Sequence, residues 1–508
     1  MSTRYTPMAM ANNQYQKPHA VIFPLPLQGH VIPSVRLALK LASNGFTITF
    51  VNTLSIHHRI RKSQPSSADN NIFTGAAKSG LDIRYMTISD GFPLGFDRSL
   101  NHDQFMEGLL HVFSSHVDEL VGKVVHCDPP VTCLIADTFF VWSSMIADKY
   151  NLVNVSFWTQ PALVLTLCYH LDLLRQNGHF ASQDNRKDTI DYIPGVRAIE
   201  PKDVIYFLQA TADNVSKVAH RIAYKAFDDV KRADFIVCNT VQELESETIL
   251  ALQQKQPIYA IGPVFPIGLA TTVVPTSLWS ESDCTQWLHT RSHGSALYIS
   301  FGSCAHVSKQ DVVEIAYGVV LSGVSFIWVL RPDVVKSDEA DFLPTGFEDE
   351  IKGKGLIVPW CHQMAVISHP TIGGFLSHCG WNSILESICC GVPLLCFPLQ
   401  SDQFTNRKLV VDDWRIGLNL CDKKPITRQE VADKIKGLMN GDQLGDELRK
   451  NMKEFKRIRE RRVGDMDLEI GGAEAVQEDD AKDDDSEENE EDFLSETHVV
   501  VGFAWPWD

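Results

Sequence analysis

Short apolar runs alternate with amphipathic helical patterns along the chain, and this order constrains the fold more than any other feature. From His19 an apolar run (AVIFPLP) leads through the loop LQGHVIP into a helical pattern, and a second apolar run (FTITFV) follows Gly45. Strand, loop, helix and strand in this order form the repeating unit of a parallel sheet. The same pattern predicts further strands at 83–86, 132–136, 152–157 and 235–238.

A second alternation follows the Pro/Gly-bearing stretch IGPVFPIG and the polar stretch TTVVPTSLWSESD, which together indicate a domain linker. Its predicted strands are 296–301, 326–330, 356–358, 372–377 and 394–397. We therefore expect an α/β protein with two doubly wound, Rossmann-like domains facing across a cleft. The length of 508 residues also favours two domains over one. The expected segments are an N-terminal domain, a linker and a C-terminal domain, at 19–265, 266–285 and 286–462.

Charge is concentrated at one end of the chain. Residues 464–508 hold 17 Asp or Glu and one Lys, which contribute −16 of the net charge of −18 and leave the other 463 residues at −2. That body has no broad basic surface for nucleic acid and no polybasic membrane patch, so a small ligand suits it better. We expect the acidic tail, 463–508, and the first 18 residues to be disordered.

Cysteine usage and hydropathy indicate a cytoplasmic protein. The 12 cysteines form no CxxC pair and no Cys/His zinc spacing, so we expect neither disulfides nor structural zinc. No apolar run reaches the roughly 18 residues of a membrane span, and the N-terminus lacks the apolar run of a signal peptide. The sequence says nothing of the oligomeric state.

The segment 360–403, WCHQMAVISHPTIGGFLSHCGWNSILESICCGVPLLCFPLQSDQ, carries the strongest functional signal. Within it a strand runs through HCGWN into a helix, and a turn of small residues at a helix N-terminus leaves backbone N–H groups for phosphate. His378 adds a potential donor, and Glu386 follows Asn382 by about one turn, where a carboxylate suits the two hydroxyls of a ribose. Taken singly, Asn382 and Ser383 also suit helix caps, and Glu386 suits a solvated position.

As a whole the segment closely resembles the signature of the plant-type UDP-sugar glycosyltransferases, two-domain enzymes of the GT-B fold. Further segments resemble the family in order, LPLQGHVIP, IADTFF, VCNTVQELE, IGPV, SALYISFGS, FIWVLRPD and FLPTGF, and the resemblance covers roughly residues 19–440. It implies that uracil and ribose meet Trp360, Cys361, Gln363 and Glu386. The diphosphate would meet Ser303, His378, Trp381, Asn382 and Ser383. The transferred sugar would meet Thr159, Asp402 and Gln403.

His30 and Asp137 are the candidates for acid–base chemistry. His30 lies near a predicted helix start, where the dipole disfavours positive charge and a neutral imidazole is ready to accept a proton. Asp137 ends a predicted strand on the same rim of the sheet, where a carboxylate can fix the imidazole tautomer and stabilise the imidazolium. A lone His or a strand-end Asp is more often structural, but the resembling family uses a His–Asp pair at these two positions.

The resemblance implies an inverting transfer from an α-linked UDP-sugar to a hydroxyl or carboxyl group, giving a β-glycoside and UDP. No metal ion is expected, because the helix terminus, backbone donors and His378 would meet the charge of UDP. Gln403 favours UDP-glucose within the family. The acceptor would be a phenolic, flavonoid or terpenoid molecule. Its cleft could be lined by aromatic side chains, which are equally suited to the core: Phe92, Phe96, Phe139, Phe140, Trp142 and Trp158.

The sequence departs from the family pattern at two places. Cys361 and His362 stand where the family commonly has a small residue and Pro, and we expect this to change the uracil loop only modestly. The larger departure favours a rival interpretation: GDMDLEIGGAEAVQEDD follows Arg462 in place of a closing helix. Without that helix, water would be excluded less well from the donor site, and the chain would be a weak or silent UDP-sugar-binding homologue. A dinucleotide-dependent oxidoreductase is disfavoured, because LQGHVIP and not GxGxxG follows the first strand.

Overall fold

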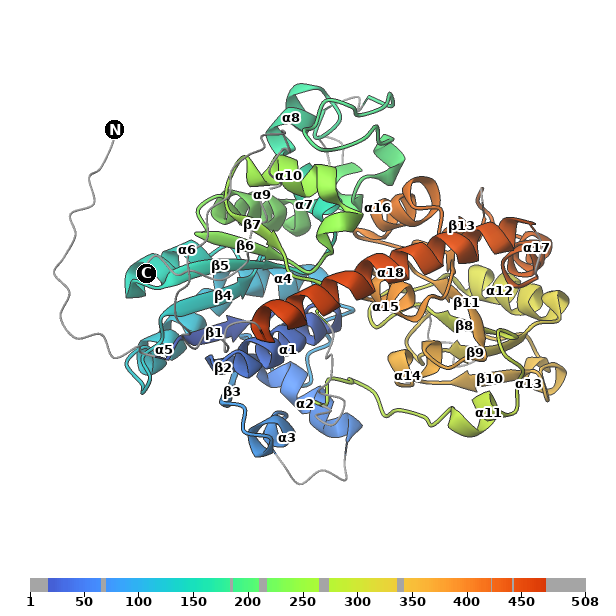
Figure 1. The fold of residues 1–508 in the computed structure, drawn as a ribbon, viewed down its shortest axis with the longest axis horizontal. Coiled ribbons are helices and arrows are strands. Elements are labelled where there is room, and N and C mark those ends of the chain that lie inside the picture. Colours follow the sequence, from blue (N-terminus) through green and yellow to red (C-terminus); the bar gives the residue numbers. More distant parts are fainter. Residues whose placement is uncertain are drawn as a thin grey trace, which may run out of the picture. The chain divides into compact units, whose positions relative to one another are not determined.

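The computed structural model describes residues 17–64, 70–182, 186–209, 217–264, 274–335, 342–421, 423–440 and 443–471. Through Glu460 these residues belong to one compact unit that contains two parallel sheets (Figure 1). We call residues 17–264 the first half and residues 285–460 the second half. The predicted disordered residues 1–16 and 472–508 lie outside the described chain.

The first half is built on a seven-stranded parallel sheet with the order β3-β2-β1-β4-β5-β6-β7. Every residue of β1, β2 and β4 is buried, as expected for strands covered on both faces. The strands are β1 (His19–Phe23), β2 (Thr47–Thr53), β3 (Ile83–Ile88), β4 (Cys133–Asp137), β5 (Val153–Trp158), β6 (Phe235–Cys238) and β7 (Ile258–Ala260). The helices are α1 (Gln28–Ser43), α2 (Leu54–Ser63), α3 (Thr74–Lys78), α4 (His102–His111), α5 (Phe113–Val124), α6 (Ser143–Tyr150), α7 (Ala162–Tyr169), α8 (Leu171–Gln176), α9 (Val218–Val230) and α10 (Ser246–Gln253).

The second half repeats the design with a six-stranded parallel sheet in the order β10-β9-β8-β11-β12-β13. Its strands are β8 (Ala296–Ser300), β9 (Ser325–Val329), β10 (Gly355–Val358), β11 (Ile372–Ser377), β12 (Leu394–Cys396) and β13 (Gly417–Asn419). Its helices are α11 (Thr285–His289), α12 (Lys309–Ser322), α13 (Phe347–Glu350), α14 (Gln363–Ile367), α15 (Trp381–Cys390), α16 (Gln403–Lys408), α17 (Arg428–Met439) and α18 (Gln443–Gly471).

The predicted fold class is confirmed, and every predicted strand is present within one or two residues of its expected ends. Two strands were missed, β7 and β13, each of three residues at the edge of its sheet. A three-residue edge strand buries too little apolar surface to leave a readable hydrophobic run. Of the predicted linker, residues 274–284 are described and form no helix or strand.

Hydrogen bonds join the two halves near the carboxyl ends of their strands. The indole N–H of Trp381, the first residue of α15, donates to the backbone oxygen of Asn239 at 2.8 Å. Arg407 of α16 forms an ion pair with Asp203 at 2.5 Å, and both side chains are largely buried. Ligand sites of doubly wound sheets lie at the carboxyl ends of the strands. These contacts bring the carboxyl-terminal edges of the two sheets together, so that both edges can border one ligand site.

Helix α18 corrects one prediction. It continues through Gly471, so residues 463–471 are helical although the sequence assigned them to a disordered tail. Its start is anchored in the second half by the buried side chains of Leu448 and Met452 and by Phe455, whose ring lies 5.5 Å from that of Trp414. Among the residues that the structure describes, no helix is long and apolar enough to cross a bilayer.

Candidate active site

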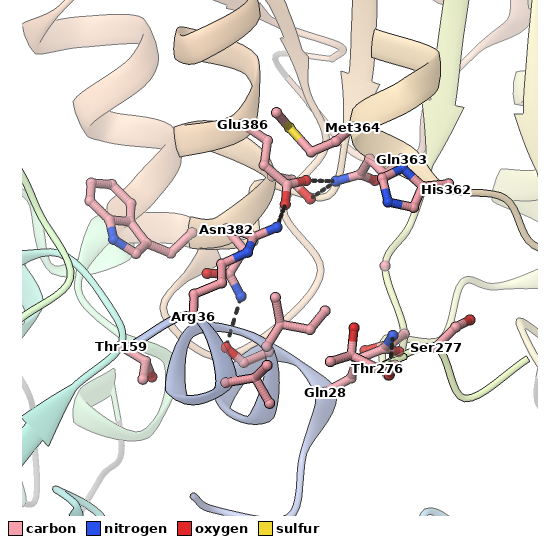
Figure 2. A pocket seen from close by; sticks show the side chains of 18 of the residues that line it. Gln28, Arg36, Thr159, Thr276, Ser277, His362, Gln363, Met364, Asn382 and Glu386 are labelled. Atoms are coloured by element: carbon pink, nitrogen blue, oxygen red, sulfur yellow. Dashed lines mark hydrogen bonds and ion pairs between the residues drawn. The ribbon is translucent and has the colours of Figure 1, made fainter. Parts of the chain in front are cut away.

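A cavity of about 710 Å³ lies between the halves (Figure 2). Its walls combine α1 and the end of β5 with the turn after β8, the loop after β10 and helix α15. This volume falls in the range of about 300–1,000 Å³ that small-molecule sites occupy. Most of the predicted donor residues line it: Thr159, Ser303, Trp360, Cys361, Gln363, His378, Trp381, Asn382, Ser383, Glu386 and Asp402.

His30 and Asp137 meet at the first half's edge of this cavity. His30 lies in the first turn of α1, and Asp137 is the last residue of β4, the strand beside β1 in the sheet. Their side chains share a 2.6 Å hydrogen bond between Nδ1 and Oδ2. The Thr159 hydroxyl lies 2.9 Å from the same Nδ1. With Nδ1 held by these partners, Nε2 is the ring nitrogen available to exchange a proton with a ligand.

Charge around His30 favours its protonated form. Burial alone lowers the pKa of this imidazole, but the charge and hydrogen bond of Asp137 and the charge of Asp402 outweigh it, so its pKa lies above 6.5. Asp402 is itself buried, which raises the pKa of its carboxyl group, and Asn406 and His30 oppose that effect. A basic imidazole with a stabilised cation is the arrangement that general-base catalysis requires.

The His378 ring lies close to two glycines, Gly302 in the turn after β8 and Gly380 just before α15. A Cβ atom at Gly302 would lie 2.3 Å from its Nε2 and one at Gly380 would lie 2.5 Å away, so larger residues at either position would collide with the ring. Burial lowers the pKa of His378 to about 4, with the Ser300 backbone opposing and Arg331 adding to the effect. The ring is therefore neutral near pH 7 and can contribute a hydrogen bond, but no charge, to an anion at this helix end.

A polar network surrounds Glu386 at the middle of the cavity. Its Oε2 accepts a hydrogen bond of 2.8 Å from the Gln363 amide, which also donates to the Ser383 hydroxyl at 3.0 Å. Its Oε1 accepts one of 2.9 Å from Arg36, which reaches across from α1 (Figure 2). The predicted ribose carboxylate is thus buried and paired with the opposite half.

The loop after β10 carries Trp360, the residue predicted to stack on the uracil ring. The Trp360 ring lines the cavity, and the Cys361 thiol is buried with its Sγ 3.6 Å from the hydroxyl of Tyr298. His362 caps α14, because its Nδ1 accepts a hydrogen bond of 3.1 Å from the backbone N–H of Ala365. An imidazole cap thus supplies a local reason for His at this departure from the family pattern.

Two predicted donor residues are turned to other partners. The Gln403 side chain is buried, and its Oε1 accepts hydrogen bonds from the backbone N–H groups of Leu399 and Gln400, so it braces a loop and is absent from the cavity lining. The Asn382 amide donates to the backbone oxygen of Gly29 at 2.8 Å and thereby links α15 to the first half. Asp402 lines the cavity, and its carboxylate accepts a hydrogen bond from Asn406 at 2.7 Å.

The candidate acceptor aromatics belong mainly to the core. Phe140, Trp142 and Trp158 are buried, and Phe92 stacks on Phe96 with ring centroids 4.4 Å apart. Phe139 differs, because its ring lies 6.0 Å from that of His30. It lines a second space of about 10 Å³ together with other apolar residues, which include Phe140 and residues of α4 and α9.

Sequence reasoning missed Arg36 and Trp279. Arg36 resembles any exposed helix residue in the sequence, and only the docking of the halves brings it to Glu386. Trp279 lies in the polar stretch taken as a linker, yet its ring stacks on Trp360 with centroids 4.8 Å apart. No local pattern signals either contact, because each depends on segments far apart in the sequence.

Within the described residues, no three His, Cys, Asp or Glu side chains form a group that could hold a metal ion. The twelve cysteines are free thiols, and most of them are buried.

Two facing parallel sheets with a ligand-sized cavity between them define the GT-B class of glycosyltransferases, and solved structures agree. One is Phytolacca americana UGT2 complexed with UDP-2fluoro-glucose and pterostilbene, which is 28% identical with a TM-score of 0.69 and covers 88% of this chain and 95% of that one. Another is a UDP-glucose: anthocyanidin 3-O-glucosyltransferase in complex with UDP, which is 26% identical with a TM-score of 0.72 over 87% and 94% of the two chains.

The chain belongs to the plant UDP-glycosyltransferase family. The model of the family described as UDP-glucoronosyl and UDP-glucosyl transferase matches residues 281–467. UDP-glycosyltransferase 86A1 of Arabidopsis thaliana is 65% identical over 452 residues, 88% of this chain and 91% of the relative. The 7-deoxyloganetin glucosyltransferase of Catharanthus roseus is 34% identical over 89% and 94% of the two chains. The protein is therefore an enzyme that transfers a glycosyl group from a UDP-sugar to a small metabolite.

Proposed function

We propose that this enzyme transfers glucose from UDP-glucose to a hydroxyl or carboxyl group of a small apolar plant metabolite, with inversion, giving a β-glucoside and UDP. The observation that carries the proposal is the His30–Asp137 pair, whose His30 lines the same cavity as Gln363 and Glu386. Transfer from a nucleotide sugar requires a group that accepts the acceptor's proton and polar side chains that bind the ribose hydroxyls, and the two must border the same cavity.

In the proposed reaction His30 Nε2 accepts the proton of the acceptor hydroxyl as its oxygen attacks the anomeric carbon. The new C–O bond forms on the face opposite the bond to phosphate, which breaks and releases UDP. Asp137 keeps Nδ1 protonated through its 2.6 Å hydrogen bond and stabilises the imidazolium that results. A single displacement of this kind converts an α-linked donor into a β-linked product.

The donor would lie along the second half, with uracil on Trp360 and the ribose hydroxyls at Glu386 and Gln363. The diphosphate would lie at the N-terminus of α15, where backbone N–H groups and the neutral His378 ring donate hydrogen bonds. These donors are the proposed means of stabilising UDP as it leaves, and the proposal includes no metal ion. Full activity after dialysis against EDTA would support that part, and loss of activity restored by Mg²⁺ would contradict it.

The transferred sugar would lie near Asp402 and Thr159, between the diphosphate and His30. Glucose is proposed on the resemblance at Gln403, whose buried amide braces the loop beside Asp402 through Leu399 and Gln400. Gln403 would then select the sugar by shaping this loop. The proposed location is the cytoplasm, where UDP-glucose would have to be available to the enzyme.

The acceptor would enter beside His30 and Phe139, against the apolar side chains of α4 and α9. Names of relatives support a plant metabolite: one acts on 7-deoxyloganetin, and one solved structure contains pterostilbene. A phenolic, flavonoid or terpenoid body with one reactive oxygen suits a wall built mainly from apolar residues.

The test measures UDP release from UDP-glucose over phenolic, flavonoid and terpenoid acceptors, with His30→Ala as control and with the anomeric configuration of the product read by NMR. Acceptor-dependent release that the variant loses, together with a β-linked product, supports the proposal. An α-linked product would overturn inversion. UDP binding without turnover over the whole panel would favour the second candidate, a catalytically silent homologue suggested by the atypical C-terminal sequence.

A further inference from the structure

Trp279 lies behind the ring proposed to carry the nucleobase. Its ring is stacked on Trp360 with centroids 4.8 Å apart and planes inclined by 30°. Trp360 lines the cavity and Trp279 does not, so Trp279 packs against Trp360 without itself bordering the ligand space. The backbone supports the same arrangement, because the N–H of Ser282 donates to the Trp360 oxygen at 2.9 Å.

Two guanidinium groups lie over the Trp279 ring. Arg59, from α2 in the first half, lies 4.8 Å from its centroid, and Arg331, which follows β9 in the second half, lies 5.5 Å away. Burial lowers the pKa of both guanidinium groups, and the charge of Asp333 opposes this decrease without cancelling it. The charge of Arg59 lowers the pKa of Arg331 further. An aromatic face gives such desolvated cations a favourable electrostatic partner without adding charge.

Arg331 connects this stack to the predicted phosphate turn. The residue is 2% exposed, and its guanidinium donates to the backbone oxygens of Ser303 at 2.9 Å and Ala305 at 2.5 Å. Ser303 lines the cavity beside His378. The cation that lies over Trp279 therefore also fixes the shape of the turn after β8.

Arg59 connects the stack to the first half through the end of α2. Ser63, on the same helix, donates from its hydroxyl to the backbone oxygen of Ser277 at 2.7 Å, and the Ser280 hydroxyl donates back to the Ser63 oxygen at 3.3 Å. The stretch around Trp279 is therefore bound on both sides, to α2 and to the Trp360 loop.

We propose that Trp279 is a positioning residue for donor binding, which holds Trp360 in its base-stacking orientation and links it to Arg59 of the first half and to the Arg331-supported turn at Ser303. This inference rests on the proposed function, because it takes Trp360 as the nucleobase platform. Trp279 touches no substrate atom itself. Its contribution is to hold the Trp360 ring in place before the donor binds. Binding then loses less conformational entropy, and the affinity for the donor is higher.

The test compares full-length Trp279→Ala and Trp279→Phe proteins with wild type, measuring UDP dissociation constants by calorimetry, KM for UDP-glucose, KM for the acceptor, and kcat. We expect Trp279→Ala to raise the UDP dissociation constant and the donor KM by about tenfold, since an aromatic pair and a cation over its ring together contribute on the order of 1–2 kcal/mol. Acceptor KM and kcat should change less than about twofold. Trp279→Phe keeps an aromatic face and should recover most of the affinity.

Trp287 provides a matched control. It is also a tryptophan with a guanidinium over its ring, that of Arg291 at 4.8 Å, but it lies outside the cavity lining. Trp287→Ala should lower the melting temperature while leaving UDP affinity unchanged. A second variant, Arg59→Gln, should weaken UDP binding by a few-fold, with little further loss when combined with Trp279→Ala, because both remove the same contact.

Two outcomes would overturn the inference. One is a Trp279→Ala protein that binds UDP within about twofold of wild type, and the other is an equal loss of affinity in Trp287→Ala, which would reveal a general effect of destabilisation. Binding of UDP by wild type distinguishes this result from failure of the proposed function. A wild-type protein that binds no UDP would overturn both the proposed function and the role of Trp279. If wild type binds UDP without turnover, the dissociation constants of the variants still test the role of Trp279.

Discussion

The two halves share one architecture but build their parts of the site differently. In the second half, the segment from Trp360 to Asp402 supplies about half of the residues that line the cavity, and polar groups within it bond to one another. In the first half, His30 and Asp137 come from separate elements, and the apolar space beside them is only about 10 Å³. Under the proposed function, the donor site is therefore largely preformed, whereas an acceptor bound against Phe139 would need side chains around that ring to move.

The substitution His30→Ala should distinguish most clearly the proposed catalytic role of the first half from UDP binding by the second half. Removing the proposed base should lower kcat/KM by roughly 10²–10⁴-fold, while the UDP dissociation constant stays within about twofold because the donor contacts lie in the second half. Stopped assays of UDP release and calorimetry with UDP measure the two quantities. His116→Ala is the control, since His116 is a partly buried histidine of the first half whose Nδ1 bonds to the Ser89 backbone oxygen outside the cavity. Full activity in His30→Ala would contradict its assignment as the base.

The converse variant is Glu386→Ala in the second half. Loss of a carboxylate that accepts hydrogen bonds should weaken UDP binding by about 10–100-fold, corresponding to roughly 1.5–3 kcal/mol for bonds to a charged group. Turnover at saturating donor should fall far less. Unchanged UDP affinity, measured by calorimetry, would show that Glu386 serves only as a partner of Arg36.

The dependence of turnover on pH probes the edge where the halves meet. His30 must be neutral to accept a proton, and its pKa is raised above 6.5, so kcat/KM should increase with pH through a midpoint above that value. Asp402 of the second half contributes to the raised pKa. Asp402→Asn should therefore move the midpoint of the profile to lower pH. A midpoint that stays in place would show that Asp402 does not influence His30.

The smallest expected effect concerns the acceptor side. Phe139→Ala should enlarge the 10 Å³ space and change acceptor KM by a few-fold in favour of bulkier acceptors, with donor KM unaffected. Steady-state kinetics over acceptors of increasing size measure this change. The same relative preference in wild type and variant would indicate that Phe139 does not border the acceptor.

Local patterns predicted the fold and pointed to a segment, 360–403, whose predicted site residues mostly line one cavity, and there is a physical reason for this. Buried parallel strands are continuous apolar runs, and the phosphate turn, Asn382 and Glu386 lie within two helical turns, so spacing alone brings them together. The pairing of His30 with Asp137 needed the rule that strand carboxyl ends share an edge, together with the family resemblance.

What could not be predicted depends on long-range docking. Arg36 reaches Glu386, Asn382 bonds to Gly29, and Trp279 supports Trp360 only because separate segments meet in three dimensions. The assignment of Gln403 to the sugar stays a prediction, and its sequence position did not reveal that the side chain also accepts hydrogen bonds from backbone donors of its own loop.

Under the proposed function, the ion pair between Arg36 and Glu386 is a contact that the donor must displace in order to bind. A ribose hydroxyl that approaches Oε1 competes with a guanidinium already bound there at 2.9 Å. The free energy of nucleotide binding then reflects the difference between two states of Glu386, one bonded to Arg36 and one bonded to the ribose. When UDP departs, Arg36 can reclaim its partner, so the same contact that opposes capture of the donor also favours release of the spent nucleotide.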